Sequence, residues 1–274
     1  MPVNLELENL HVLITGGSKG IGLACARGFL AEGARVTLVS RTMETLLAAQ
    51  ASLMAMLINA DPNADAALRV NIIAADLRDA AEAERAVETI ERDFGAVDVL
   101  VNSAGAAKRT PTDELTAAAW QDAMQAKFFT YIHVINPLIK RMGERGHGAV
   151  VNIIGSGGKV ATVTHLAGGA ANAALMLASA GLAAAYAGKG VRVNAVNPGL
   201  TLTERLHEGI EAEARQQGIT MEEALTRAKA TRPLGRIAEP SEIADAVVYL
   251  ASNRASYITG AVVAMDGAVT PMVV

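Results

Sequence analysis

The sequence is poor in cysteine, in aromatic side chains and in net charge. Its one cysteine, Cys25, excludes a disulfide framework, and the apolar residues around it predict a small buried hydrophobic side chain. Aromatic residues make up only 3% of the chain, so the core has to be built mainly from Ala, Val, Leu and Ile. A formal net charge of −4 without any basic cluster argues against a nucleic-acid-binding face.

Targeting and metal-binding signals are missing as well. Residues 1–6 do not have the pattern of a signal peptide, and no apolar run reaches the length that spans a bilayer. The five histidines, the cysteine and the acidic residues show no metal-ligand spacing. We therefore expect a cytoplasmic protein with no metal centre and no membrane or nucleic-acid partner.

Apolar runs of strand length alternate with longer stretches that have helical spacing. The predicted strands are 10–15, 34–40, 69–75, 96–101, 149–154, 191–196 and 261–265. The predicted helices are 21–30, 42–59, 79–94, 113–142, 166–187 and 240–250. This alternation indicates right-handed βαβ crossovers and a parallel sheet with both faces covered. We predict one α/β domain over residues 1–274, of the Rossmann-type doubly wound class, with ligands at the carboxyl ends of its strands.

The first predicted strand ends in a glycine-rich turn, Thr-Gly-Gly-Ser-Lys-Gly-Ile-Gly at 15–22. Glycines at 16, 20 and 22 let the backbone approach a ligand where a Cβ would block it. The unpaired N–H groups and the positive dipole end of the following helix suit a pyrophosphate. The alternative is a tight turn without a ligand, but strand, loop and helix together favour a dinucleotide site.

Further short motifs follow in one order along the chain: Asp76-Leu77, Asn102-Ser103-Ala104-Gly105, Trp120, Ser156, Asn-Ala-Val-Asn-Pro-Gly at 194–199, and Asp266-Gly267. With the glycine turn, they make essentially the whole chain resemble the short-chain dehydrogenase/reductase family. The resemblance implies a seven-stranded sheet, homodimers or homotetramers, and hydride transfer between a nicotinamide and a carbonyl or alcohol carbon of a small molecule.

The resemblance also implies a set of cofactor-binding residues. Those of the glycine turn, facing the pyrophosphate, are Gly16, Ser18, Lys19, Gly20, Ile21 and Gly22. The adenosine side is bordered by Asp76, Leu77, Asn102, Ala104 and Gly105. The segment that holds the nicotinamide amide contains Pro198, Gly199, Thr201 and Thr203.

The end of the second predicted strand decides between the two nicotinamide cofactors. An NAD enzyme usually places a carboxylate there for the ribose hydroxyls, whereas this chain has Ser40-Arg41, with Lys19 in the facing glycine turn. Two cations and no carboxylate suit a 2′-phosphate. We predict NADP(H), the alternative being that both cations are solvated surface charges.

The family's proton-transferring tyrosine, and the lysine four residues after it, are missing from their expected positions. Counting back from Asn194, these positions fall on Gly168 and Asn172. None of the chain's tyrosines, Tyr131, Tyr186, Tyr249 and Tyr257, has a lysine four residues on. Glycine has no proton to give, and asparagine carries no charge. Loss of a general acid typically costs about 10² to 10⁴ in rate.

Two groups could compensate. Lys127 stands at the family's asparagine position and could direct its ammonium into the space beside Asn172; otherwise it is a solvated helix charge. His165, three residues before Gly168, could donate a proton; otherwise it is a loop histidine. Lys159 is a weaker candidate.

Two functions stay open from the sequence. The first is an NADP(H)-dependent oxidoreductase with a non-standard active site, in which Ser156 orients a carbonyl or hydroxyl substrate and His165 or Lys127 assists. The second is a catalytically degenerate NADP(H)-binding protein that acts as a sensor or structural subunit. In both readings the polar stretch of about 201–230, with helical content, is expected to cover the substrate as a lid.

Overall fold

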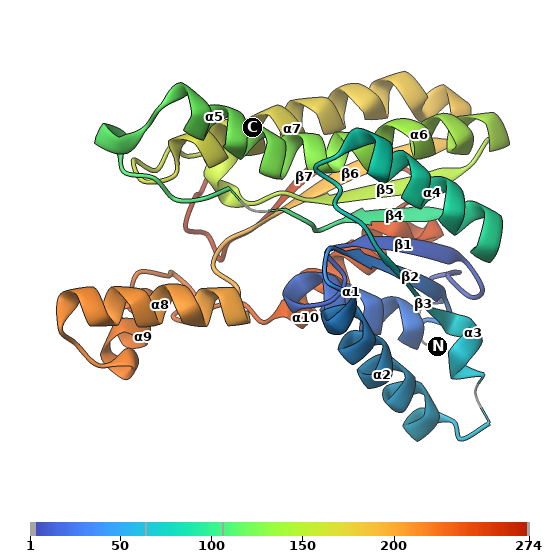
Figure 1. Ribbon diagram of the computed structural model, residues 1–274, viewed down its shortest axis with the longest axis horizontal. Coiled ribbons are helices and arrows are strands. Elements are labelled where there is room, and N and C mark those ends of the chain that lie inside the picture. Colours follow the sequence, from blue (N-terminus) through green and yellow to red (C-terminus); the bar gives the residue numbers. More distant parts are fainter. Residues whose placement is uncertain (1–3, 64, 106, 273–274) are drawn as a thin grey trace.

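The computed structural model describes residues 4–63, 65–105 and 107–272; the first three residues of the N-terminal stretch therefore lie outside it. Seven parallel strands form one sheet in the order β3-β2-β1-β4-β5-β6-β7 (Figure 1). They are β1 (His11–Thr15), β2 (Arg35–Ser40), β3 (Val70–Ala74), β4 (Val99–Asn102), β5 (Gly148–Ile153), β6 (Val191–Pro198) and β7 (Val262–Met265). The predicted Rossmann-type doubly wound sheet is confirmed.

Helices cover both faces of this sheet (Figure 1). They are α1 (Gly20–Ala31), α2 (Met43–Ala60), α3 (Ala66–Arg69), α4 (Ala80–Phe94), α5 (Ala117–Ala123), α6 (Thr130–Arg145), α7 (Leu166–Tyr186), α8 (Glu204–Gln217), α9 (Met221–Ala230) and α10 (Pro240–Ala251). One core cluster lies between the sheet and α1, α2 and α10, and a second lies between the sheet and α4, α6 and α7. Because both faces are covered, the strands are continuous apolar runs.

Cys25 lies on the buried face of α1, as its apolar neighbours predict. It is fully enclosed in the core, and burial raises the pKa of its thiol to about 12. A thiol in this environment stays protonated at neutral pH and acts as a small apolar side chain.

Two helices, α2 and α7 with its extension to Lys189, are long and apolar enough by composition to cross a bilayer. The expectation that no apolar run reaches this length is wrong by this measure. Both helices pack against the sheet: α2 buries Leu46 and Leu53, and α7 buries Leu175. Their apolar character is that of core helices.

The predicted helix over 113–142 is interrupted. A 3₁₀ turn (Thr112–Glu114) comes first, α5 begins after the cap residue Thr116, and a π-helical turn (Met124–Phe129) separates α5 from α6. Periodicity alone cannot show an extra residue in a helical turn, and such turns occur often at functional sites. This one contains Lys127.

The polar stretch after β6 forms the helices α8 and α9, which project from the sheet as a hairpin (Figure 1). The hairpin has a small core of its own around Ile210, Ala214 and Ala224. Its polar composition follows from this shape, because two helices standing off the sheet expose most of their surface to water.

The strand order places the site. The chain runs outward from β1 to β3 and then crosses to β4 on the other side, so the order reverses between β1 and β4. A crevice opens at such a reversal beyond the carboxyl ends of the strands.

Candidate active site

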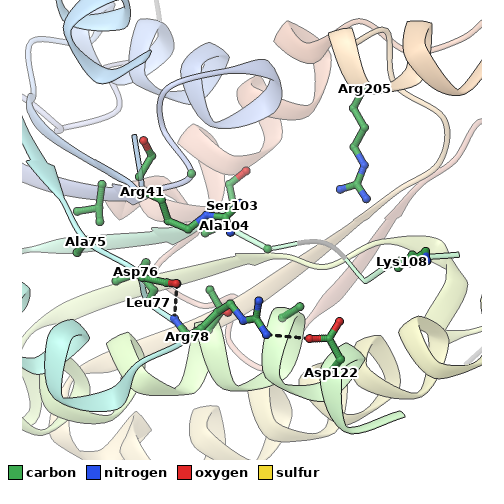
Figure 2. A pocket seen from close by; sticks show the side chains of 16 residues that line it. Arg41, Ala75, Asp76, Leu77, Arg78, Ser103, Ala104, Lys108, Asp122 and Arg205 are labelled. Carbon is green, nitrogen blue, oxygen red and sulfur yellow. Dashed lines mark hydrogen bonds and ion pairs between the residues drawn. The ribbon is translucent and has the colours of Figure 1, made fainter. Parts of the chain in front are cut away.

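A cavity of about 570 Å³ lies at this reversal, beyond the carboxyl ends of β1 to β4 (Figure 2). The predicted cofactor residues that line it are Gly16, Arg41, Asp76, Leu77, Ala104 and Gly105. The other predicted residues are not part of its wall, and Gly20 and Thr203 line a separate cavity instead. The cavity therefore brings together the residues predicted for the adenosine side and the first glycine of the turn.

The glycine turn packs directly on the loop that follows β4. Gly16 has a φ of +66°, and a Cβ on it would lie 2.8 Å from the Ala104 Cα atom. A Cβ on Gly22 would overlap the carbonyl oxygen of Gly16. A side chain at either position would force the backbone of the turn or of the loop after β4 to shift. Ser18 lies within this turn, and Ile21, in the first turn of α1, packs against the core.

The helix α1 begins at Gly20, and no side chain caps its first turn, which also contains no acidic residue. The first N–H groups of any helix have no intrahelical partners, and in α1 no side-chain cap takes their place. These N–H groups lie beside the glycine turn. These groups and the positive end of the helix dipole can bind a phosphate.

The two predicted phosphate-binding cations are placed differently. Arg41 lines the cavity, and no hydrogen bond or ion pair joins its side chain to another described residue. Lys19 does not line the cavity; its Nζ forms an exposed ion pair of 2.8 Å with Glu204 Oε2. Of the two, only Arg41 has its charged group at the cavity.

Sequence reasoning missed three further cations in the cavity wall: Arg78, Lys108 and Arg205. Arg78 is paired with Asp122 at 2.8 Å, as Figure 2 shows. Its position directly after Asp76-Leu77 was a usable signal. Lys108 and Arg205 gave no signal in the sequence, because they lie in a loop and in a helix that come together only in the folded chain.

Asn102 lies behind the cavity, fully buried at the end of β4. Its amide oxygen accepts a hydrogen bond from Thr15 (3.2 Å), and its amide nitrogen donates to Asn152 (3.0 Å). The Thr15 hydroxyl in turn accepts from the backbone N–H groups of Ser103 and Ala104. Asn102 thus ties β1, β4 and β5 together and fixes the loop that lines the adenosine side.

The residues predicted for the nicotinamide amide follow β6. Pro198 ends the strand, and the Gly199 N–H donates to the Met265 carbonyl at 3.0 Å. Thr201 is buried, while Thr203 caps α8 by accepting a hydrogen bond from the Leu206 N–H. A Cβ on Gly20 would lie 3.2 Å from the methyl group of Thr203, so this segment faces the glycine turn.

Ser156 follows β5 and begins a glycine-rich 3₁₀ turn (Ser156–Gly158). This turn packs tightly against the start of α7. A Cβ on Gly169 would lie 2.7 Å from the Gly157 carbonyl oxygen, and one on Gly158 would lie 2.7 Å from the Ala173 nitrogen. The glycines on both sides therefore let the Ser156 loop and α7 approach closely.

His165 is the residue just before α7, and its ring lies over Gly168. A Cβ on Gly168 would lie 2.6 Å from the ring nitrogen Nε2, closer still to Cε1, and 2.8 Å from the Cβ of Ala107. The imidazole thus fills the space into which a side chain at position 168 would project. It also reaches toward the Ser156 loop, because its Cδ2 lies 3.3 Å from the Cβ position of Gly157.

The environment of His165 favours the neutral ring. Its Nδ1 is buried and has no hydrogen-bond partner among the described residues. Burial lowers the pKa of His165 below its usual 6.5, and the positive charges of Arg109, Arg205 and Lys127 lower it further. The ring is therefore uncharged at neutral pH and can accept a proton.

Lys127 is buried in the π-helical turn. Its ammonium donates hydrogen bonds to the hydroxyl of Tyr131 (2.7 Å) and to the Ile153 carbonyl at the end of β5 (3.1 Å). Burial and the charge of Arg205 lower its pKa to about 7. The alternative of a solvated helix charge is therefore excluded.

No hydrogen bond joins Lys127 to Asn172. The Asn172 amide nitrogen instead lies 3.5 Å from the Cβ position of Gly155, against the Ser156 loop. The ammonium of Lys127 is thus held at the end of β5 by Tyr131 and Ile153, and its placement beside Asn172 stays a sequence-based prediction. Within the described ranges, no group of three or more His, Cys, Asp or Glu side chains could hold a metal ion.

Comparison with known proteins decides the family. A family model described as enoyl-(acyl carrier protein) reductase matches residues 16–270. The D-threitol dehydrogenase of Mycolicibacterium smegmatis is 33% identical over 267 residues, which cover 97% of this chain and 95% of that protein. The chain belongs to the short-chain dehydrogenase/reductase family. It is a nicotinamide-dependent oxidoreductase of this family, whose members act on small molecules.

Solved structures of the family show the same fold. L-sorbose reductase from Gluconobacter frateurii, complexed with NADPH and L-sorbose, has a TM-score of 0.91 and 29% identity, covering 99% of this chain and 100% of that one. An NADPH-bound short chain oxidoreductase from Pseudomonas aeruginosa, described as containing an atypical catalytic center, has a TM-score of 0.84 and 31% identity. That match covers 97% of this chain and 100% of the other.

Proposed function

We propose that this short-chain dehydrogenase/reductase is an NADP(H)-dependent oxidoreductase in which His165 moves the proton and Ser156 orients the reacting oxygen. The substrate is a carbonyl compound or an alcohol. The position of the His165 ring carries the proposal: a titratable group with an unpartnered ring nitrogen lies over Gly168 and reaches toward the Ser156 loop. Gly168 and Asn172 then stand at the family's tyrosine and lysine positions.

The residues around the cavity fit a dinucleotide with a 2′-phosphate. The close approach of the glycine turn, which a Cβ at Gly16 or Gly22 would prevent, leaves room for a pyrophosphate beside the start of α1. Arg41 offers an unpaired guanidinium at the end of β2, where it can bind a phosphate through two hydrogen bonds. We therefore assign NADP(H), which supplies or accepts the hydride when bound.

The chain's own residues supply the proton chemistry. A neutral His165 accepts the proton of a substrate hydroxyl during oxidation and returns it to the oxygen during reduction. Ser156 holds that oxygen by a hydrogen bond. Burial and the charges of Arg109 and Arg205 keep His165 neutral at rest, and the charge that Lys127 carries when protonated adds the smallest contribution. A lowered pKa therefore suits this histidine to act as a base in alcohol oxidation at neutral pH.

Single-turnover measurements test this proposal. NADPH-loaded protein is mixed with a panel of ketones, quinones and aldehydes, and NADPH oxidation is followed by its absorbance. We expect Ser156→Ala and His165→Gln each to lower the rate by about 10² to 10⁴. The control, His207→Gln, removes an exposed histidine of α8 and should leave the rate unchanged. Tight NADPH binding without oxidation across the panel would favour a sensor or structural protein instead.

Three further assignments belong to this proposal. The α8–α9 hairpin (Glu204–Ala230) acts as the substrate lid, because it begins at Thr203, beside the glycine turn, and stands off the sheet. The protein assembles as a homodimer or homotetramer, as members of this family usually do. It works in the cytoplasm.

A further inference from the structure

Positive side chains gather at the end of the cavity nearest His165. Lys108 and Arg205 line this end, and Figure 2 shows them apart from Arg41 and Asp76 at the other end. Arg109 follows Lys108 in the same loop. A hydrogen bond of 3.0 Å from the Thr110 N–H to the Thr164 carbonyl fastens this loop beside His165.

Within the part of the chain that the structure describes, these cations are unpaired. Among the described residues, no hydrogen bond or ion pair reaches the side chain of Lys108, Arg109 or Arg205. Partial burial and, after it, the charge of Arg109 lower the pKa of Arg205, and Glu208 is the one acid that opposes this shift. Both arginines also act on His165. Exposed guanidinium groups that no carboxylate pairs are free to bind an anion through paired hydrogen bonds.

We propose that the substrate carries an anionic group, a carboxylate or a phosphate, and that Arg109 and Arg205 bind this group while the reacting oxygen lies at Ser156 and His165. This inference rests on the proposed function, because it places the substrate at the same site. Guanidinium groups recognise both anions by the same paired hydrogen bonds. Lys108 adds a third positive charge at the cavity wall.

The arginines do not serve the cofactor phosphates in this arrangement. The pyrophosphate site is at the glycine turn and the 2′-phosphate site is at Arg41, at the end of β2. Arg205 is on the lid helix α8, and Arg109 is on the loop beside His165. Binding of an anion between them would draw the lid toward the catalytic loop, so the substrate's charge would also close the site.

The test compares matched probes on the NADPH-loaded protein. Acetoacetate is paired with methyl acetoacetate, and dihydroxyacetone phosphate is paired with dihydroxyacetone, so that one arm reports on carboxylates and the other on phosphates. Binding of malonate and inorganic phosphate, measured by calorimetry, gives a readout independent of turnover. The variants are Arg109→Gln and Arg205→Gln. The control is Arg215→Gln, an exposed arginine ten residues further along α8, about 15 Å away.

We expect at least one anionic probe of a pair to exceed its neutral partner in kcat/KM by about tenfold to a hundredfold. Each of the two arginine variants should remove this preference through KM and weaken binding of malonate or phosphate to the same degree. The NADPH dissociation constant should stay unchanged, which also shows that the variants are folded. The control should match the wild type.

Three results would overturn the inference. Equal turnover of anionic and neutral partners in both arms would show that charge is not recognised. Arginine variants that weaken NADPH binding instead of anion binding would assign these residues to the cofactor. A control variant that loses as much as Arg109→Gln would indicate a general charge effect. By contrast, arginine-dependent anion binding without any hydride transfer would refute the proposed function and leave the anion site standing.

Discussion

The substitution Gly168→Ala tests the place of the His165 ring directly. The added Cβ would lie 2.6 Å from Nε2 of His165 and 2.8 Å from the Cβ of Ala107, distances at which neighbouring atoms have to move. Overpacking of this kind costs about 1–3 kcal/mol, against a gain of about 0.5–1 kcal/mol from replacing glycine in a helix. The free energy of unfolding should therefore fall by up to about 2.5 kcal/mol, and the ring has to leave its place.

Gly181→Ala is the matched control in the same helix, since a Cβ there meets no heavy atom within 4 Å. It should stabilise the protein by about 0.5–1 kcal/mol and leave activity unchanged. Gly168→Ala should be less stable than this control by about 1–3 kcal/mol. It should also lose about 10² to 10⁴ in kcat/KM, because the displaced imidazole no longer reaches the substrate.

The assay is a double-mutant cycle with His165→Ala, read by urea unfolding and by single-turnover NADPH oxidation. Removing the ring removes the two nearest contacts of the added Cβ, so the alanine at 168 should cost less stability in that background, with a coupling of about 0.5–3 kcal/mol. Activity should not fall further when the second change is added. If Gly168→Ala behaves like Gly181→Ala in both stability and rate, the ring does not lie over Gly168 and the reasoning fails.

Three other measurements bear on the site. In alcohol oxidation, kcat/KM should be constant above neutral pH and should decrease at pH values below the lowered pKa of His165. His165→Gln should remove this decrease. A change of kcat/KM with an apparent pKa above 7 would contradict the role of His165. Because the pKa of Lys127 is about 7 in the folded chain and 10.5 ordinarily, the unfolded state binds more protons between these values. In urea unfolding, the free energy of unfolding of the wild type relative to that of Lys127→Met should therefore rise from pH 7 to 9. At pH 7 the variant should be the more stable by on the order of a few kcal/mol. A difference that does not change with pH would refute the buried amine. Arg41→Glu should shift the NADPH-to-NADH ratio of dissociation constants by about tenfold to a hundredfold toward NADH in fluorescence titrations, and by more than Lys19→Gln, because Lys19 is paired with Glu204. The reverse ranking would assign the phosphate to Lys19.

Local patterns predicted the frame of the molecule well. The seven strands and the long helices follow from apolar runs and their period, and these are properties of neighbouring residues. The glycine turn at 15–22 was recognisable because all the glycines that it requires lie within one short stretch of the sequence. The interruption of the helix at Lys127 was not, because an extra residue in a turn changes the apolar period too little to be seen.

The amino-acid sequence by itself determined the doubly wound sheet, the edge of the sheet at which the cavity opens and the absence of an ionisable side chain at position 168. The spacing of three residues already suggested that His165 lies near Gly168, and only the tertiary structure decided that its ring lies over this glycine and reaches toward the Ser156 loop. His165 and Ser156 belong to different segments, and Arg109 and Arg205 come from a loop and from the helix after β6. Sequence spacing carries no information on such distances, because the packing of glycine loops against α7 sets how closely the backbones approach.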